Sequence, residues 1–160
     1  MLFQGRSRPV IGLDITTSSI KLIELSRSGD GYRVESYAAE PSPPNAINEK
    51  AIVDSQAVGE AVRRAVKRAG ARSKECAVAI SGDAAITKVI QMPRNLREAE
   101  LESQVEMQAD QYIPFPMEEV SFDFEVIGPS EKDPEMLDVL LVATRSENVE
   151  QRQASVQAAG

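Results

Sequence analysis

The amino-acid sequence predicts an α/β protein with mixed sheets, in which a first lobe is joined to a small β-α-β-β unit. Three observations predict this class. Short apolar runs with the two-residue alternation of strands occur between three segments with helical periodicity. Gly- and Pro-rich separators lie between many of these segments, as they do at the ends of strands and helices. The 160 residues are 42% hydrophobic and 27% charged, which is typical of a folded protein with a sizeable core.

Three strands separated by short polar turns open the first lobe. They are expected at residues 9–15, 19–27 and 32–40. Alternation places Ile20, Leu22 and Glu24 on one face of the second strand. Since both faces of this strand mix apolar and charged side chains, we expect it to lie between two covered layers. The Pro-rich residues 41–50 end the meander, because proline has no N–H to donate to a ladder.

A helix follows, with Asp54 as its N-cap and Gly70 at its C-terminal stop. Its apolar residues recur at helical spacing, at Val58, Val62, Ala65, Val66 and Ala69. Its other side carries four cations, Arg63, Arg64, Lys67 and Arg68. Because the helix dipole favours cations near the C-terminal end, these residues predict a solvated basic face, with a surface for an acidic partner as the alternative.

A short buried strand at residues 76–81 leads into the small unit. We expect a strand at residues 84–92 and then a helix from Leu96 to about Tyr112, where Asn95 and Glu98 have capping-box spacing. The apolar stripe of this helix is Leu101, Val105, Ala109 and Tyr112. Two antiparallel strands follow, the first alternating from Val120 to Val126 and the second at residues 136–145, before a helix that Ser146 caps and that stops at Gly160.

The loop "YIPFP" after the second helix contains two prolines spaced by one residue, which forbid both a helix and a central strand. Tyr112, Ile113 and Phe115 are therefore expected on an ordered apolar loop. Such a loop either docks a partner or locks the helix against the strand that follows it.

Composition excludes several classes of function. The net charge of −7 opposes the positive field that non-specific nucleic-acid binding requires, so we expect no nucleic-acid partner. The chain has no histidine, which removes Ser-His-Asp catalysis and histidine metal sites. Its one cysteine, Cys76, is expected as a structural thiol in a reducing compartment. The first nine residues lack the apolar region of a signal peptide, and the longest apolar run, at residues 139–143, is far below a membrane span, so we expect a cytoplasmic protein without direct membrane insertion.

The turn between the first two strands is the candidate site. Asp14 ends the first strand, Lys21 lies on the returning strand, and four hydroxyl residues line the turn, namely Thr16, Thr17, Ser18 and Ser19. Successive backbone N–H groups in a tight turn bind phosphate oxygens, a carboxylate can hold Mg through water, and Lys supplies a compact cation. These residue types are also ordinary in a structural hairpin, and the chain lacks the Walker pattern.

The stretch "IGLDITTSSIKLIELSRSGDGYRVE" resembles the first phosphate loop of the actin-like ATPases, in which an Asp is followed seven residues later by a Lys. A wider resemblance, most specific at "DQYIPFPMEEV", is to the PilM family of type IV pilus assembly proteins, which are related to FtsA. The resemblance implies an actin-like, RNase H-like first lobe with an inserted subdomain. It divides the chain into a subdomain 1A at residues 8–86, a subdomain 1C at residues 87–145 and the start of a return helix at residues 146–160.

The resemblance also implies functions for single residues. It makes Asp14 the Mg-side carboxylate, Thr16, Thr17, Ser18 and Ser19 the turn that cradles phosphate, and Lys21 the phosphate cation. ATP and Mg are thereby the expected cofactors of the longer family members. The expected partners are the short cytoplasmic N-terminal tail of the membrane protein PilN, received by the first lobe and the inserted subdomain, and other pilus assembly proteins. Recruitment to the inner membrane would come from such a partner.

Two departures from the family pattern bear on the site. Thr16 stands where actin-like proteins usually have Gly, so we expect the turn to be shaped differently or to bind phosphate less tightly. The chain also resembles only an N-terminal portion of the family. Since the family binds ATP between two halves, we expect these residues alone to bind ATP weakly or not at all.

Two enzyme hypotheses stay open beside the interaction module. A phosphotransferase or ATP-hydrolysing enzyme needs positioned Mg, cations and a group that orients the nucleophile, of which Asp14 and Lys21 supply two. A nuclease of the RNase H type needs several carboxylates around two metals, and the spacing of Glu24 and Glu35 does not predict convergence on Asp14.

Overall fold

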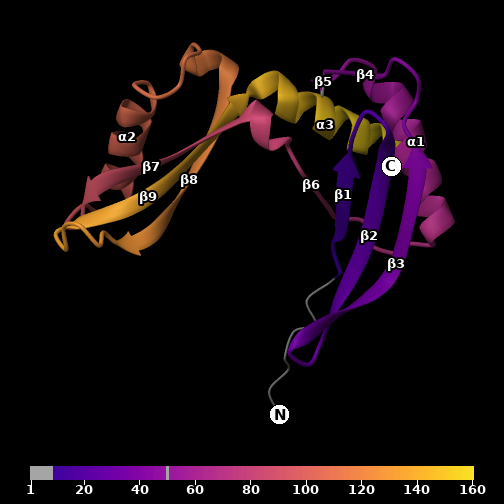
Figure 1. The fold of residues 1–160 in the computed structure, drawn as a ribbon, viewed down its shortest axis with the longest axis horizontal. Helices are drawn as coiled ribbons and strands as arrows, with labels where there is room; N and C mark the ends of the chain where they lie inside the picture. Colours follow the sequence, from indigo (N-terminus) through magenta and orange to yellow (C-terminus); the bar gives the residue numbers. More distant parts are fainter. Residues whose placement is uncertain (1–8, 50) are drawn as a thin grey trace. The chain divides into compact units, whose positions relative to one another are not determined.

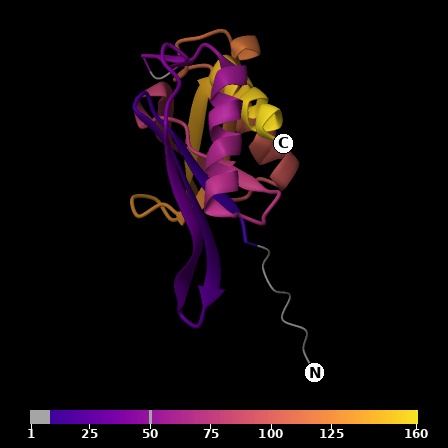
Figure 2. The same ribbon diagram turned by 90° about the vertical axis from the view of Figure 1, so that its right-hand side faces the viewer.

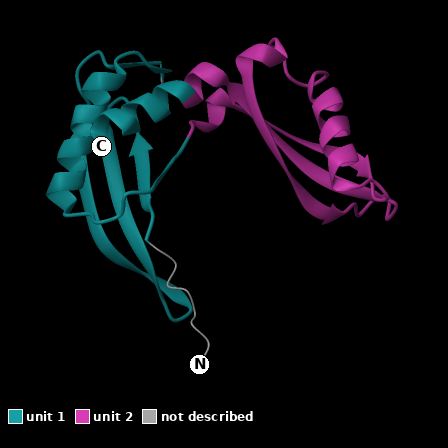
Figure 3. Cartoon of the chain, turned by 180° about the vertical axis from the view of Figure 1, so that it is seen from behind, with its two compact units in different colours: residues 1–79, 150–160 teal, residues 80–149 magenta. Residues whose placement is uncertain are grey.

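The computed structural model describes residues 9–49 and 51–160, and the chain divides into two compact units (Figure 3). Unit 1 comprises residues 1–79 and 150–160, and unit 2 comprises residues 80–149. The predicted subdomain bounds, 8–86, 87–145 and 146–160, stay predictions, and residue 8 lies outside the described residues.

Unit 1 is built on a four-stranded sheet with the order β3-β2-β1-β6, in which β1 pairs antiparallel with β2 and parallel with β6 (Figure 1). The expected strand meander is confirmed, with β1 at Ile11–Ile15, β2 at Ser19–Ser28 and β3 at Gly31–Pro41. The Pro-rich segment also contains a small hairpin that the sequence did not predict, formed by β4 (Ile47–Asn48) and β5 (Ala51–Ile52). The strand β6 is short, at Cys76–Val78.

One face of this sheet packs against helix α1 (Ser55–Ala69), as Figure 2 shows. Ile20 and Leu22 of β2 are buried on that face, whereas Lys21 and Ile23 on the other face are exposed. The expectation that β2 lies between two covered layers is therefore wrong for the part of the chain that the structure describes.

The mixed pattern that suggested two covered layers includes Glu24, a charged residue that is only 3% exposed on the buried face. Its carboxylate accepts hydrogen bonds from the backbone N–H of Ser73 at 2.9 Å and of Arg72 at 3.2 Å. The hydroxyl of Ser36 donates a third at 3.1 Å. A buried carboxylate is tolerated when its lone pairs are satisfied in this way, so Glu24 fastens the segment before β6 to the sheet.

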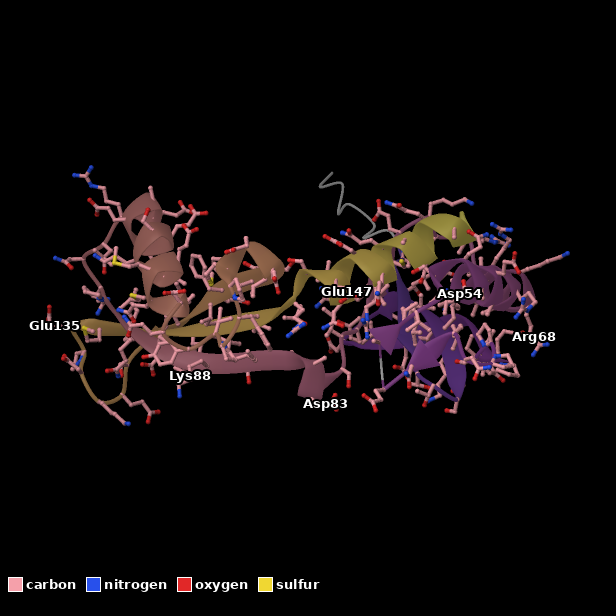
Figure 4. All side chains as sticks on the ribbon, turned by 90° about the horizontal axis from the view of Figure 1, so that it is seen from above. Asp54, Arg68, Asp83, Lys88, Glu135 and Glu147 are labelled. Carbon is pink, nitrogen blue, oxygen red and sulfur yellow. The ribbon has the colours of Figure 1, made fainter. Side chains whose placement is uncertain are left out.

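The ends of α1 are as the sequence predicts (Figure 4 labels Asp54 and Arg68 near them). The carboxylate of Asp54 accepts from the N–H of Ala57 at 2.9 Å, and Gly70 has the left-handed φ of 64°. The basic side is not merely solvated, because Arg68 lies 2.9 Å and Arg64 lies 3.9 Å from the carboxylate of Glu40 on β3.

Helix α3 (Ser146–Ala159) brings its C-terminal part against α1. At the contact, a Cβ on Gly59 would lie 2.6 Å from the Cβ of Ala158 and 2.7 Å from the carbonyl oxygen of Ser155. Arg63 also donates to the carbonyl groups of Ala158 and Ala159. Glycine is therefore needed for the close approach of the two helices.

Unit 2 is an antiparallel sheet with the order β7-β9-β8 and one helix, α2 (Glu98–Ala109). The strands are β7 at Ala85–Pro93, β8 at Val120–Pro129 and β9 at Met136–Arg145. Single turns precede β7 at Gly82–Ala84 (η1) and β8 at Met117–Glu119 (η2). The β-α-β-β order and the antiparallel pairing of the last two strands are confirmed. Nine buried residues form its core, namely Ile90, Met92, Leu101, Val105, Ala109, Ile113, Val139, Leu141 and Ala143.

Two details of unit 2 differ from expectation. The N-cap of α2 is Arg97, whose N–H donates to the carboxylate of Glu100 at 3.0 Å, so the capping box predicted at Asn95 and Glu98 is wrong. Residues 94 and 95 form a turn, and the helix begins two residues later than Leu96. Ser146 is the first residue of α3 rather than its N-cap, so the cap predicted there is wrong, and its hydroxyl contacts that of Ser121 at 3.0 Å.

Candidate functional site

The β1–β2 hairpin places the two charged residues of the candidate site opposite one another. Asp14 and Lys21 are direct partners in the antiparallel register. Their side chains lie on the sheet face away from α1, with the Nζ of Lys21 3.6 Å from the Oδ2 of Asp14. The side chain of Lys21 is 61% exposed and that of Asp14 is 52% exposed, so both groups remain accessible to a ligand.

The turn itself is closed by the side chain of Thr16. Its hydroxyl donates to the carbonyl oxygen of Ser19 at 2.8 Å and accepts from the N–H of Ser19 at 3.1 Å. The N–H of Thr16 donates to the same carbonyl oxygen at 3.0 Å. Thr16 has no positive φ, so the position does not require glycine. The turn is thus closed by the Thr16 hydroxyl together with one backbone hydrogen bond.

Two groups of the turn remain available to a ligand. Within the described residues, no hydrogen-bond acceptor meets the backbone N–H groups of Thr17 and Ser18, and both side chains are exposed. The hydroxyl of Ser18 lies 3.3 Å from that of Thr16. Exposed N–H groups beside a lysine cation can bind an anion, and phosphate oxygens are suitable acceptors.

Ser42, directly after β3, is a member of the site that the sequence did not predict. Its hydroxyl donates to the carbonyl oxygen of Thr16 at 2.6 Å, and its N–H donates to that of Ser18 at 3.2 Å. The contact with Thr16 spans a separation of 26 residues. No local sequence pattern indicates this function for a serine that follows a proline. Ser42 lies near the turn because it follows β3, in which Pro41 pairs with Ser19 of β2.

The donor set suits a hydrated metal rather than one enclosed by protein ligands. No group of three or more Cys, His, Asp or Glu side chains that could hold a metal is found within residues 9–49 and 51–160. Asp14 is the one carboxylate beside the turn in the register of the hairpin. A single carboxylate fits Mg²⁺, which keeps several of its waters and gains other ligands from phosphates.

The apolar loop of unit 2 divides into buried and exposed members. Ile113 is 5% exposed and belongs to the core. Phe115 is partly buried against that core, and the guanidinium carbon of Arg145 lies 4.3 Å from the centroid of the Phe115 ring. Tyr112 is 40% exposed, with the Nζ of Lys88 5.4 Å from its ring centroid. The predicted stripe of α2 therefore ends at Ala109. A partner-binding function of Tyr112, Ile113 and Phe115 stays a prediction, and Tyr112 is the member with the most surface to offer.

None of the helices formed by residues 9–49 and 51–160 has the length and apolar content needed to cross a membrane.

Comparison with known proteins gives two findings. Residues 12–160 match the family of the type IV pilus assembly protein PilM. The structure is similar to a solved structure described as a PilM-PilN type IV pilus biogenesis complex, with a TM-score of 0.82 and 30% sequence identity. This similarity confirms the predicted actin-like fold class. The match covers 94% of this chain and 44% of the other, so the chain spans less than half of the length of its structural neighbour.

Proposed function

Because the chain belongs to the family of the type IV pilus assembly protein PilM, we propose that it acts in pilus assembly by binding the cytoplasmic N-terminal tail of the membrane protein PilN. The similarity to a PilM-PilN complex over 94% of the chain carries this proposal. The protein would work in the cytoplasm as a scaffold, and the tail would recruit it to the inner membrane. Other pilus assembly proteins would bind the longer protein of which this chain corresponds to a part.

Tyr112 is our choice for a contact of the tail on unit 2. It follows α2 and is 40% exposed, and the Nζ of Lys88 lies 5.4 Å from the centroid of its ring. Exposed aromatic rings in a fixed orientation bind partners at a low cost in side-chain entropy. Pro114 and Pro116 restrict the backbone beyond it, which keeps the ring in place before the partner arrives.

The test is a fluorescence anisotropy titration of a labelled peptide that copies the PilN tail of the same genome. We expect saturable binding, and Tyr112→Ala should weaken it about tenfold, as for a moderate interface hot spot. Tyr32→Ala removes a ring that is 74% exposed on unit 1 and serves as the matched control. Equal binding of the peptide and of its scrambled version would contradict the proposal.

A second function, binding of a nucleotide phosphate, is favoured by the Asp14–Lys21 pair beside the N–H groups of Thr17 and Ser18. We propose that Lys21 and these N–H groups contact phosphate oxygens, while Asp14 holds Mg through water. Thr16 and Ser19 shape the turn through their mutual hydrogen bonds. In the longer protein, bound ATP and Mg would make further contacts outside these residues. The exposed position of the hairpin supports a weak affinity for these residues alone.

Hydrolysis would need a further group that orients the nucleophile, beyond the carboxylate and the cation. The measurement that separates binding from hydrolysis is phosphate release from Mg-ATP by this chain and by its Asp14→Asn variant. We expect no release above the buffer rate from either protein. Release that depends on Asp14 would favour the ATP-hydrolysing alternative.

A further inference from the structure

We propose that Ser42 is a positioning residue for the phosphate turn, and that it couples the turn to the segment formed by residues 42–49 and 51–54. This inference rests on the proposed phosphate binding and assigns a function to a residue that does not itself contact the ligand. Two hydrogen bonds carry it, from the hydroxyl of Ser42 to the carbonyl oxygen of Thr16 at 2.6 Å and from its N–H to that of Ser18 at 3.2 Å.

These two bonds fix the orientation of two peptide groups in the turn, Thr16–Thr17 and Ser18–Ser19. In a trans peptide the C=O and the following N–H point in opposite directions. Because Ser42 binds the carbonyl of Thr16, the N–H of Thr17 points away from Ser42 and has no acceptor within the described residues. The carbonyl of Ser18 is held in the same way, and the N–H after it donates to the hydroxyl of Thr16.

A turn of this kind would otherwise be free to rotate its central peptide groups. A rotated Thr16–Thr17 peptide would present a carbonyl oxygen, which repels an anion, in place of an N–H. Ser42 therefore keeps the donor in place before the ligand arrives, and preorganised donors bind anions more tightly than donors that must be ordered on binding.

Backbone hydrogen bonds also order the residues that follow Ser42 in the chain. The N–H of Ala46 donates to the carbonyl oxygen of Pro43 at 3.3 Å. The carbonyl oxygen of the buried Ala46 accepts from the N–H of Val53 at 2.9 Å and from that of Asp54 at 3.2 Å. Asp54 is the N-cap of α1. Ser42 thus bonds to the turn, and Ala46, four residues later in the chain, bonds to the start of α1.

Linkage makes this coupling reciprocal. If Ser42 raises the affinity of the turn for phosphate, then phosphate in the turn must stabilise the hydrogen bonds of Ser42 by the same factor. The segment contains two residues with positive φ, Asn45 at 58° and Glu49 at 45°, which are less favourable for side chains other than Gly. Ligand binding is therefore expected to suppress the local opening of this segment.

The experiment is an amide NMR titration of this chain with Mg-ATP, followed by amide hydrogen exchange in the free and bound states. We expect saturable shifts of the Thr17 and Ser18 amides and slower exchange of the Ser42 and Val53 amides. Ser42→Ala should weaken binding roughly fivefold, the factor that the net contribution of one hydrogen bond gives. It should also abolish the ligand-dependent protection of Val53.

Three variants separate positioning from a general loss of stability. Ser42→Thr keeps the hydroxyl and should restore binding. Ser42→Cys has a similar size with a weak S–H donor and should weaken binding even if Ser42→Ala does not fold. The matched control is Ser73→Ala, which removes two hydrogen bonds between the hydroxyl of Ser73 and the backbone of Glu75 in unit 1. It should leave the affinity for Mg-ATP unchanged.

The outcomes distinguish the two levels of the proposal. If Ser42→Ala and Ser42→Cys bind Mg-ATP as tightly as the parent chain, the positioning function is wrong while the phosphate site stands. If Mg-ATP leaves the Thr17 and Ser18 amides of the parent chain unshifted even at concentrations high enough to detect weak binding, both the phosphate site and the function of Ser42 are wrong.

Discussion

Replacing Gly59 by alanine tests the packing that holds unit 1 together. An alanine in a helix interior is ordinarily about 1 kcal/mol more favourable than glycine. At position 59 the added methyl would lie 2.6 Å from the Cβ of Ala158 and 2.7 Å from the carbonyl oxygen of Ser155. Neither atom is the far end of a flexible side chain, so α3 must move away from α1.

The expected effect follows from these two opposing contributions. Overpacking of a rigid contact costs about 1–3 kcal/mol, and a contact with backbone belongs in the upper part of that range. After subtraction of the helix-propensity gain, Gly59→Ala should lower the free energy of unfolding by about 1–2 kcal/mol. For a unit of this size that corresponds to a fall in Tm of roughly 5–12 °C.

Thermal and urea denaturation followed by circular dichroism measure the change. Gly82→Ala is the control, because a Cβ there meets nothing within 4 Å. Adding Ala158→Gly to the Gly59→Ala variant removes one of the two short contacts and should recover part of the loss, as coupled neighbours do. A Gly59→Ala chain that is more stable than the parent would show that α1 and α3 do not pack at this distance.

Three further changes test other parts of the structure. Glu24→Gln should lower the free energy of unfolding, measured by urea denaturation, by about 2 kcal/mol, because it replaces a carboxylate that accepts three hydrogen bonds by an amide. The control is Glu60→Gln on α1, which changes an exposed residue and should have little effect. The Ser26 hydroxyl and then Arg33 lower the pKa of Glu35, so the stability that Glu35 adds is fully present above its ordinary pKa and is lost as the pH falls through the lowered one. The stability difference between the parent and Glu35→Gln should thus vanish in acid, and a constant difference would contradict this. Burial raises the pKa of the Cys76 thiol, so its reaction with a disulfide reagent at pH 8 should be slow in the folded chain and faster in urea; equal rates would contradict the burial.

Local patterns predicted the elements whose signals lie within a few residues. The caps of α1 at Asp54 and Gly70, the two antiparallel strands of unit 2 and the hairpin that carries Asp14 and Lys21 all follow from short-range spacing. In each case the residues that decide the structure are close in sequence. Their propensity agrees with the packing that the fold imposes.

The parts that could not be predicted depend on contacts between distant residues. Glu24 breaks the apolar pattern of β2 because its partners, the N–H groups of Arg72 and Ser73, lie 48 and 49 residues away. Ser42 carries no pattern of its own, and its function at the turn is visible only once β3 lies beside β2. Tyr112 continues the helical spacing of α2, but the helix ends at Ala109 and Tyr112 is 40% exposed.

The central claim is that these residues bind a partner tail in pilus assembly, and calorimetric titration with the PilN tail peptide tests it most directly. The titration is made with and without Mg-ATP, using a scrambled peptide as the control. We predict saturable, one-to-one binding without nucleotide. Absence of heat with the tail peptide under both conditions, from a chain shown to be folded, would contradict the claim.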